Sequence, residues 1–344
     1  MTGAATPAPA RPCSASAACC ARDAPPAARA PPPYGRSRFA ARGGIHRAGN
    51  PSVSTGRAMS ALHPIISVTG SSGAGTTSVR NTFEQIFRRE SVTAVYIEGD
   101  AFHSMDRATM RKAMAAEPTL SHFGERANLL DELEGVFRLY AETGGGRTRH
   151  YIHDRNDSER WGGAPGTFSA WEEFEPDSDL LFYEGLHGAV HNERINIAQY
   201  ADLKIGVVPV INLEWIQKLH RDRATRGYST EAVTDVILRR MPDYVNVICP
   251  QFTNTDINFQ RIPTVDTSNP FIARWIPTAD ESMVVIRFRD PKGIDFPYLI
   301  SMIAGSFMSR ANSVVIPGGK LDLAMQLILT PMILQLVERR RRLL

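Results

Sequence analysis

A glycine-rich stretch between a short apolar run and a helical pattern constrains this chain more than any other feature. The apolar run covers residues 65–68, and the stretch after it contains Gly70, Ser71, Ser72, Gly73, Ala74, Gly75, Thr76 and Thr77. Against the pattern G-x-x-x-x-G-K-[ST], both glycines and Thr77 fit, whereas Thr76 replaces the lysine. Backbone N–H groups of such a loop surround a phosphate at a helix N-terminus, and the last hydroxyl binds Mg²⁺. The strand–loop–helix order therefore favours a phosphate-binding site over a ligand-free turn.

The missing lysine requires another cation to neutralise the phosphates. Residues 218–227 read KLHRDRATRG; Lys218 and Arg221 lie three apart and share a helical face, and Arg226 precedes a flexible glycine. Nucleotide kinases use such a basic lid on the transferring phosphoryl group. The alternative is a solvated charged face with an Asp222–Arg226 pair. Downstream of a phosphate loop without lysine, the lid is the favoured interpretation, with Lys218 and Arg221 as catalytic residues.

Two carboxylates follow other apolar runs. Asp100 ends the strand expected around residues 94–97, and Glu184 comes directly after residues 180–183. Open α/β sheets bind ligands at the carboxyl ends of their strands, so both acids are expected beside the glycine-rich loop. Asp100 is a candidate base for an attacking hydroxyl, and Glu184 is a candidate partner of Mg²⁺. An aspartate that only caps the next segment is the alternative, and two acids at two strand ends count against it.

Buried apolar runs alternate with helical patterns, which predicts a mainly parallel sheet covered by helices on both faces. Further strands are expected at residues 203–208, 283–288 and 313–316, the last two at the sheet edge. Asn212 is the predicted N-cap of a helix through Arg223. Residues 323–336 predict a buried C-terminal helix, shorter than a membrane span. The expected fold is a three-layer α/β sandwich with extra edge strands and a C-terminal helix.

Residues 1–58 differ in composition from the rest of the chain. They are rich in Ala, Pro, Arg and Gly, with eight arginines, no lysine and one acid, Asp23. This stretch carries +7, so the formal +3 of the whole chain leaves −4 for the remainder, which argues against a nucleic-acid or membrane binder. Without an apolar pattern, the stretch is expected to be a disordered or spurious extension, with an organelle transit peptide as the alternative. Residues 59–344 are expected to form a single domain.

Cysteine usage bears on the cellular compartment. Cys13, Cys19 and Cys20 lie in the first 58 residues, and Cys249 is the one cysteine of the remainder. One thiol cannot form an internal disulfide, so this part of the chain needs no oxidising compartment. We expect a cytoplasmic protein that is not controlled by dithiol exchange.

Six sequence strings, in order, resemble one known family. They are GSSGAGTT, IEGDAFH, YIHD, LLFYEGLHG, KLHRDRATRG and DVILRRM, and they are similar to the proteobacterial branch of the phosphoribulokinases, which belong to the uridine-kinase-like P-loop kinases. The resemblance spans about residues 62–336, and a Thr in place of the loop lysine is familiar in that branch. It implies the P-loop kinase fold and transfer of the γ-phosphoryl group of ATP to the C1 hydroxyl of ribulose 5-phosphate. That reaction supplies the carbon dioxide acceptor of the Calvin cycle in photosynthesis.

The resemblance also implies a role for each matched residue. Asp100 would be the base for the C1 hydroxyl, and Glu184 and Thr77 would serve Mg²⁺. Lys218 and Arg221 would act on ATP and the transferring phosphoryl group. The sugar phosphate would be held by His103, Arg107, Tyr151, His153 and Arg226.

Regulation is likewise implied by the family. NADH would activate and AMP would inhibit a large homo-oligomer, with an octamer among the expected sizes, and the adjacent Arg239 and Arg240 would form the effector site. A pair of solvated arginines is the alternative for that dipeptide.

The residues by themselves do not name the sugar, and two other functions stay open. The first is a different uridine-kinase-like small-molecule kinase, and the second is a regulatory P-loop protein that binds nucleotide without catalysis. The cations His103, Arg107 and Arg226 favour a phosphorylated acceptor, because an uncharged one needs no anion site. Asp100 and Glu184 favour catalysis, because signalling alone needs no base.

Overall fold

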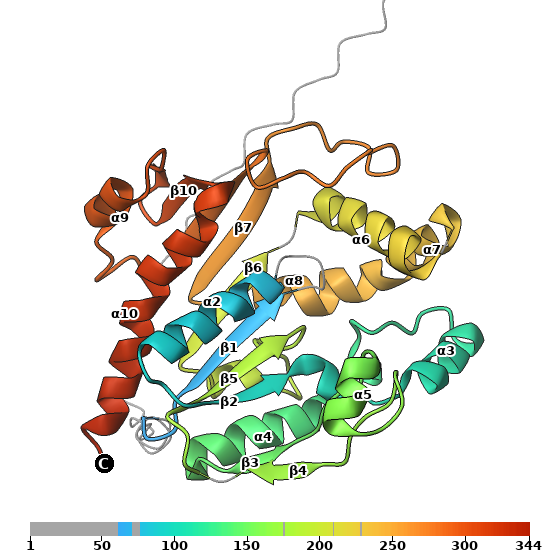
Figure 1. The fold of residues 1–344 in the computed structure, drawn as a ribbon, viewed down its shortest axis with the longest axis horizontal. Coiled ribbons are helices and arrows are strands. Elements are labelled where there is room, and N and C mark those ends of the chain that lie inside the picture. Colours follow the sequence, from blue (N-terminus) through green and yellow to red (C-terminus); the bar gives the residue numbers. More distant parts are fainter. Residues whose placement is uncertain (1–60, 71–75, 175, 209, 228) are drawn as a thin grey trace, which may run out of the picture. The chain divides into compact units, whose positions relative to one another are not determined.

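An eight-stranded sheet organises the part of the chain that the computed structural model describes, which is residues 61–70, 76–174, 176–208, 210–227 and 229–344. Its strands are β1 (Ile65–Gly70), β2 (Ala94–Glu98), β5 (Leu180–Gly185), β6 (Leu203–Val208), β7 (Ile257–Pro263), β8 (Ser282–Phe288), β9 (Phe307–Arg310) and β10 (Ser313–Pro317). They follow the order β2-β5-β1-β6-β7-β8-β10-β9 (Figure 1). A separate ribbon pairs β3 (Gly146–Thr148) with β4 (Glu172–Phe174). Every described residue belongs to one unit of the chain, Ser52–Leu344.

The sheet is parallel at one side and antiparallel at the other. Strands β2, β5, β1, β6 and β7 pair in parallel, whereas β8, β10 and β9 are antiparallel to their neighbours. The expectation of a mainly parallel sheet with extra strands is therefore confirmed. The outermost position on the antiparallel side belongs to β9, however, and not to either of the two predicted extra strands.

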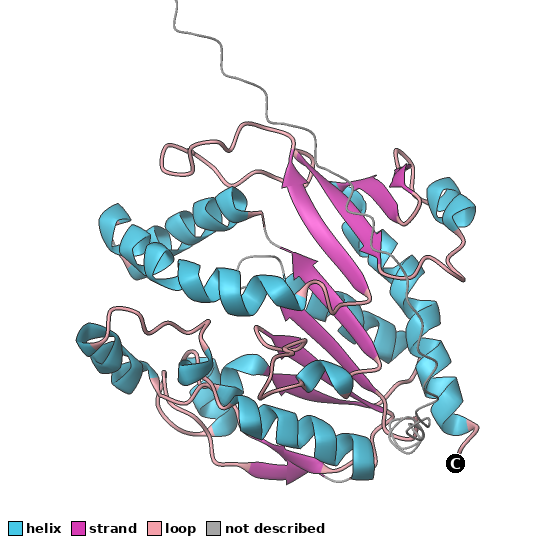
Figure 2. Ribbon diagram, turned by 180° about the vertical axis from the view of Figure 1, so that it is seen from behind, coloured by secondary structure: helices cyan, strands magenta, loops and turns pink. Residues whose placement is uncertain are grey.

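Helices cover both faces of the sheet. They are α2 (Thr76–Arg89), α3 (Arg107–Ala116), α4 (Leu130–Thr143), α5 (Arg155–Trp161), α6 (Ile211–Arg226), α7 (Thr230–Asp243), α8 (Cys249–Gln251), α9 (Phe296–Met302) and α10 (Leu321–Arg341). Alternate residues of β1 show how the faces divide, since Ile66 packs with α2 and α10 while Ile65 packs with α4. Both faces of a parallel strand are thus buried, which explains its unbroken apolar sequence. The single sheet is seen from behind in Figure 2.

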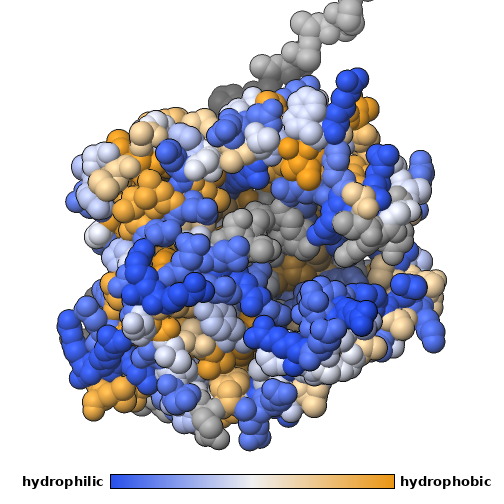
Figure 3. Space-filling model, in the orientation of Figure 1, coloured by the Kyte–Doolittle hydropathy of each residue, from blue (hydrophilic) through white to orange (hydrophobic). Residues whose placement is uncertain are grey.

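Helix α10 is long and apolar enough to cross a membrane by length and composition. It packs along the sheet and α2, and its fully or almost fully buried side chains are Ala324, Met325, Ile328, Leu329, Ile333 and Val337. These side chains belong to the main core cluster, as predicted for a buried C-terminal helix. The expectation that this segment is shorter than a membrane span is wrong, because the helix extends beyond residues 323–336 at both ends. Large apolar side chains stay exposed on α9, β9 and the start of α10, namely Tyr298, Met302, Phe307 and Leu323. Figure 3 shows hydrophobic residues gathered at the upper left of the molecule, on the side where Figure 1 labels α9 and β10.

One local prediction is wrong. Asn212 was expected to cap α6, but that helix already begins at Ile211, after Val210, which makes no side-chain cap hydrogen bond. Asn212 therefore lies inside the first turn. The Gly-rich residues Ser71–Gly75 and the extension 1–58 lie outside the described residues, so the predictions made for them stay predictions.

Candidate active site

The carboxyl ends of the parallel strands meet at one large cavity of about 1300 Å³. Helices α6 and α7 lie above these strand ends in Figure 1, and α3 and α5 lie below them. Of the residues singled out in the sequence, Gly70, Asp100, Tyr151, His153, Glu184, Lys218 and Arg221 line the cavity. Pockets for single small molecules are usually about 300–1,000 Å³, so there is room for two substrates.

The two candidate acids are brought together by glycines. Strand β2 stops at Glu98, and Asp100 lies in the 3-10 turn Gly99–Phe102 that follows, not in the strand as expected. A Cβ on Gly99 would lie 2.8 Å from the Cα of Gly185, the residue after Glu184. Side chains are excluded at this contact, so the turn of Asp100 and the end of β5 come as close as two backbones can.

Asp100 has two histidine neighbours. Its carboxylate is 44% exposed, with Oδ1 3.3 Å from Nε2 of His103 and Oδ2 3.8 Å from Nε2 of His153. Partial burial by itself would raise the pKa of Asp100, but the hydrogen bond and charge of His103, together with His153, hold that pKa below its usual value. The carboxylate is therefore ionised at neutral pH and ready to accept a proton.

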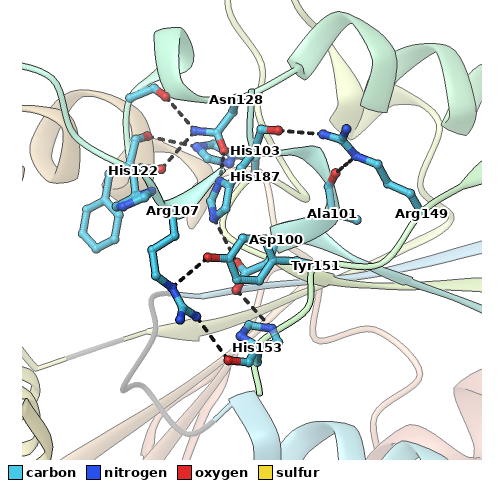
Figure 4. A network of polar contacts seen from close by, with 12 residues as sticks. Asp100, Ala101, His103, Arg107, His122, Asn128, Arg149, Tyr151, His153 and His187 are labelled. Carbon is cyan, nitrogen blue, oxygen red and sulfur yellow. Dashed lines mark hydrogen bonds and ion pairs between the residues drawn. The ribbon is translucent and has the colours of Figure 1, made fainter. Parts of the chain in front are cut away.

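A loop after β3 brings further groups to Asp100 (Figure 4). Arg107, at the start of α3, donates from Nε to the Tyr151 hydroxyl at 3.3 Å and from Nη2 to the carbonyl of His153 at 3.2 Å. Tyr151 also meets His153 edge to face, with ring centroids 4.9 Å apart. Three of the five predicted sugar-phosphate residues thus contact one another, and a fourth, His103, contacts Asp100. The side chain of Arg226 lies outside the described part of the chain.

Arg149 was not identified from the sequence, and it fixes the turn that carries Asp100. Its Nε donates to the carbonyl of Ala101 at 2.7 Å and its Nη2 donates to the carbonyl of His103 at 2.8 Å. The guanidinium lies 3.7 Å from the centroid of Phe168 and 4.8 Å from that of Trp171. A planar guanidinium can donate both hydrogen bonds from fixed positions while its face lies against aromatic rings, and an ammonium group lacks this planar geometry.

Helix α6 supplies the opposite wall. Lys218 Nζ is 2.5 Å from Oδ2 of the buried Asp222, and Arg221 Nε is 3.2 Å from its Oδ1. Lys218 and Arg221 were predicted to share one face of the helix, and both contact the carboxylate of Asp222. Burial and the charge of Arg240 lower the pKa of Lys218 to about 8, although Asp222 acts in the opposite direction.

The candidate magnesium and phosphate groups lie at the ends of β5 and β1. Glu184 is half-buried in β5 and is in register with Val68 of β1 on one side and Glu98 of β2 on the other. A carboxylate and a threonine hydroxyl are oxygen donors of the kind that Mg²⁺ prefers. The backbone of Thr76 and Thr77 opens helix α2, while their side chains lie outside the described part.

A buried glutamine joins these strand ends and was also missed in the sequence. Gln251 accepts at Oε1 from the Thr69 hydroxyl and the Ala189 amide, and donates from Nε2 to the carbonyls of Leu186 and Val247. It follows a π-helical turn, Tyr244–Ile248, that continues α7. Its contacts hold the residue before Gly70 against the residues after Glu184.

The two adjacent arginines of α7 point to different elements. Arg239 donates from Nη1 to the carbonyl of Met114 at 3.0 Å, at the end of α3. Arg240 lies 5.0 Å from the ring centroid of Phe123 and shares a small cavity of about 20 Å³ with Lys218. The contacts described for the two side chains are thus with different elements, the end of α3 for Arg239 and the segment of Phe123 for Arg240.

Known proteins resemble this chain over most of its length. A family model described as "Phosphoribulokinase / Uridine kinase family" matches residues 65–268, which is more than half of the chain. A phosphoribulokinase of Nitrobacter vulgaris is 73% identical over 285 residues, covering 81% of this chain and 98% of the relative. Phosphoribulokinase 1 of Cereibacter sphaeroides is 70% identical over 288 residues, covering 82% and 99%.

A solved structure resembles the chain to a similar extent. The phosphoribulokinase from Rhodobacter spheroides is 68% identical and matches with a TM-score of 0.75, over 82% of this chain and 99% of that one. At this identity and coverage, the fold and the arrangement of strand ends have a direct counterpart in a kinase structure.

Proposed function

The chain belongs to the phosphoribulokinase / uridine kinase family, and from that premise we propose that it transfers the γ-phosphoryl group of ATP to the C1 hydroxyl of ribulose 5-phosphate. The products are ribulose 1,5-bisphosphate and ADP. Phosphoribulokinase activity follows from relatives about 70% identical that match almost end to end. The observation that carries the reaction chemistry is the pairing of the ionised Asp100 with cationic and aromatic groups, in a cavity that has room for two substrates.

Within this proposal, Asp100 accepts the proton of the C1 hydroxyl as that oxygen attacks phosphorus. General bases contribute typically 10²–10⁴-fold to a rate. His103, Arg107, Tyr151, His153 and Arg226 hold the phosphate already present on the sugar. The support for this group is that Arg107 contacts both Tyr151 and His153, while His103 lies at hydrogen-bonding distance from Asp100.

On the ATP side, residues 70–77 surround the phosphates. Lys218 and Arg221 neutralise charge on the transferring group in place of the absent loop lysine. Mg²⁺, when bound by Thr77 and Glu184, supplies further charge neutralisation between the phosphates. Support for the lid comes from the buried position of Lys218 at the cavity wall, opposite Asp100.

The direct test is a coupled assay of ADP release over a panel of acceptors. Ribulose 5-phosphate should give turnover, while uridine, pantothenate and unphosphorylated ribulose should not. Turnover with an uncharged acceptor instead would favour another small-molecule kinase of this family. Tight ATP binding with no turnover on any acceptor would favour a regulatory nucleotide-binding protein.

Control by metabolites is the second part of the proposal. NADH activates the enzyme and AMP inhibits it, and both bind at Arg239 and Arg240. The enzyme is a homo-oligomer, and the exposed apolar side chains of α9 and β9 provide a surface for contacts between its subunits. Arg240 supports coupling to catalysis because its charge acts on Lys218 and His103. Coupling of about 1–3 kcal/mol would change the apparent affinity for ATP roughly 5–150-fold. Rates against ATP with and without NADH, for the parent and Arg240→Ala, test this; an equal response of both proteins rules the site out.

Residues 1–58 are proposed to be dispensable, and the enzyme is proposed to act in the cytoplasm. The matches cover almost the whole length of the relatives, whereas about a fifth of this chain has no counterpart in them. This difference supports the proposal that residues 1–58 are dispensable. Burial raises the pKa of the Cys249 thiol, which disfavours the reactive thiolate form. This supports control without dithiol exchange. A protein starting at Met59 should be fully active, and reduced thioredoxin should leave its rate unchanged.

A further inference from the structure

Asn128 lies behind the catalytic turn and has a defined orientation. It is 8% exposed, and its side-chain amide group donates to the carbonyl of His122 at 3.0 Å and to that of Gly124 at 2.7 Å. Both N–H bonds point to carbonyls, so the other end of the side chain must be the oxygen. That oxygen, Oδ1, is 2.8 Å from Nδ1 of His103 (Figure 4).

This contact determines which protons His103 carries. Because Asn128 Oδ1 can only accept, Nδ1 of His103 must donate and therefore carries a hydrogen. The other ring nitrogen, Nε2, is 3.3 Å from the carboxylate of Asp100. A neutral imidazole with its hydrogen on Nδ1 would direct the Nε2 lone pair at that carboxylate. The imidazolium form alone gives both contacts a hydrogen.

We propose that Asn128 is a positioning residue that keeps His103 in the doubly protonated form, with one N–H directed at Asp100. It thereby sets the upper pH limit to which the positive charge of His103 attracts the sugar phosphate. The second statement rests on the proposed function, and the first does not. Asn128 touches neither substrate in this account and acts only through His103.

The charged neighbours of His103 come from several elements. Asp100 faces its Nε2, the ring of His122 lies 5.1 Å away, and Tyr151 meets the ring edge to face at 6.1 Å. Arg240 from α7 and the buried His187 also act on it electrostatically. Arg149 contacts the main-chain oxygen of His103 and leaves the ring free for Asn128.

Three neighbouring imidazoles show how specific the effect is. Burial, with the charge of Arg240, lowers the pKa of His122 to about 3, and burial lowers that of His187 to about 4. Burial acts in the same direction on His103, yet its hydrogen bonds to Asp100 and Asn128 raise its pKa above the ordinary value. Of the three rings, His103 is the one with a carboxylate at one nitrogen and an amide oxygen at the other.

Two substitutions of Asn128 distinguish the role of its side-chain oxygen from that of its amide N–H groups. Asn128→Leu and Asn128→Asp both remove the two N–H donors to the carbonyls of His122 and Gly124, while Asn128→Asp keeps an oxygen that faces Nδ1. A role limited to holding the 122–128 loop predicts the same result for both variants. A role in the protonation of His103 predicts different results.

The first readout is ¹⁵N NMR of the histidine rings in the full-length protein without substrate. In the parent and in Asn128→Asp, the doubly protonated form of His103 should persist to higher pH than in Asn128→Leu. In all three proteins the pH at which His103 loses its second hydrogen would be followed by titration. A parent His103 without a hydrogen on Nδ1 overturns the proposal by itself, even if no variant folds, and so does an Asn128→Leu protein whose His103 titrates like that of the parent.

The second readout is the KM for ribulose 5-phosphate against pH. The imidazolium is lost as pH rises through its pKa, so KM should rise on the alkaline side. In Asn128→Leu that rise should begin at a lower pH than in the parent, whereas in Asn128→Asp it should not move down. Equal profiles for both variants contradict the proposal. If ribulose 5-phosphate is not the acceptor, the NMR result still decides the protonation of His103.

Discussion

The two walls of the cavity hold their functional groups by different means. On the acceptor wall, formed by the turn after β2 and the loop after β3, the main chain around Asp100 is fixed by Arg149, and the His103 ring is fixed by Asn128. On the donor wall, Lys218 and Arg221 of α6 are held by one carboxylate, Asp222. A phosphate of a bound substrate would compete with Asp222 for Lys218 and Arg221. No group of a substrate would take the place of the main-chain carbonyls that accept hydrogen bonds from Arg149.

The difference assigns separate tasks to the walls. The acceptor wall is suited to holding a base at a fixed place, where misplacement by an ångström can lower a rate about 10²-fold. The donor wall is suited to redistributing positive charge as phosphates arrive. Substitutions on the acceptor wall should therefore change the catalytic rate or sugar binding, and those on the donor wall should change how the rate depends on ATP and pH.

The largest effect is expected at Asp100. Asp100→Asn removes the proton acceptor while keeping size and shape, so kcat should fall by roughly 10²–10⁴-fold with little change in either KM. Steady-state kinetics with both substrates varied provides the measurement. Asp106→Asn is the matched control, because Asn can still cap α3 in place of Asp106. A near-normal kcat in Asp100→Asn would remove Asp100 from the role of base.

The contribution of main-chain positioning is tested at Arg149. Arg149→Lys keeps the charge but loses the planar donor pair and the stacking, so kcat should fall by about 10–100-fold through misplacement of Asp100. Arg147→Lys, two residues earlier, changes an exposed arginine that pairs with Glu132 and should behave like the parent. If both variants keep the parental kcat, the acceptor wall does not depend on this contact.

Sugar-phosphate binding is tested at Arg107. A hydrogen bond from a charged group is worth about 1.5–3 kcal/mol, so Arg107→Ala should raise the KM for ribulose 5-phosphate by roughly 10–100-fold. The effect on kcat should be smaller, because the phosphate contact is present in the ground and transition states alike. Arg111→Ala, one turn later on α3, is the control. An unchanged KM would place Arg107 outside the sugar-phosphate site.

The smallest effect is a pH dependence on the donor wall. Lys218, with its pKa lowered to about 8, is protonated below that pH and loses its charge above it. The value of kcat/KM for ATP, which reports groups of the free enzyme, should therefore fall about tenfold per pH unit above pH 8. In Lys218→Arg the group stays charged, so this alkaline fall should disappear even if the overall rate is lower. The same fall in both proteins would assign it to another group.

The candidate residues that the sequence suggested are those whose chemistry is local. Gly70, Asp100, Glu184 and Lys218 were chosen because each follows an apolar run or lies in a cationic helix, and all four line one cavity. Arg149 and Asn128 were missed because their partners are distant in the sequence, or are main-chain atoms that no residue pattern encodes. Arg149 lies 48 residues from its acceptor at Ala101, and Asn128 lies 25 residues from His103.

The fold shows the same limit. Apolar runs identified six strands of the sheet in advance, β1, β2, β5, β6, β8 and β10. The runs are clearest in β1 and β5, where burial on both faces leaves an almost unbroken apolar sequence. The cap assigned to Asn212 is wrong because α6 begins at Ile211, so that the N-cap position falls on Val210, which makes no side-chain cap hydrogen bond. The effector site at Arg239 and Arg240 stays a prediction; neighbouring residues on a helix point about 100° apart, so the two side chains would approach one ligand from different directions.

Amide hydrogen exchange tests the contrast between the two walls most directly. The free enzyme would be compared with enzyme saturated in turn with ATP and with ribulose 5-phosphate. The account predicts that peptides covering residues 99–107 and 122–128 are already protected in the free enzyme and gain little with either ligand, while residues 215–223 of α6 gain protection with ATP. Strong new protection of residues 99–107 on adding ribulose 5-phosphate, with none in α6 on adding ATP, would contradict it.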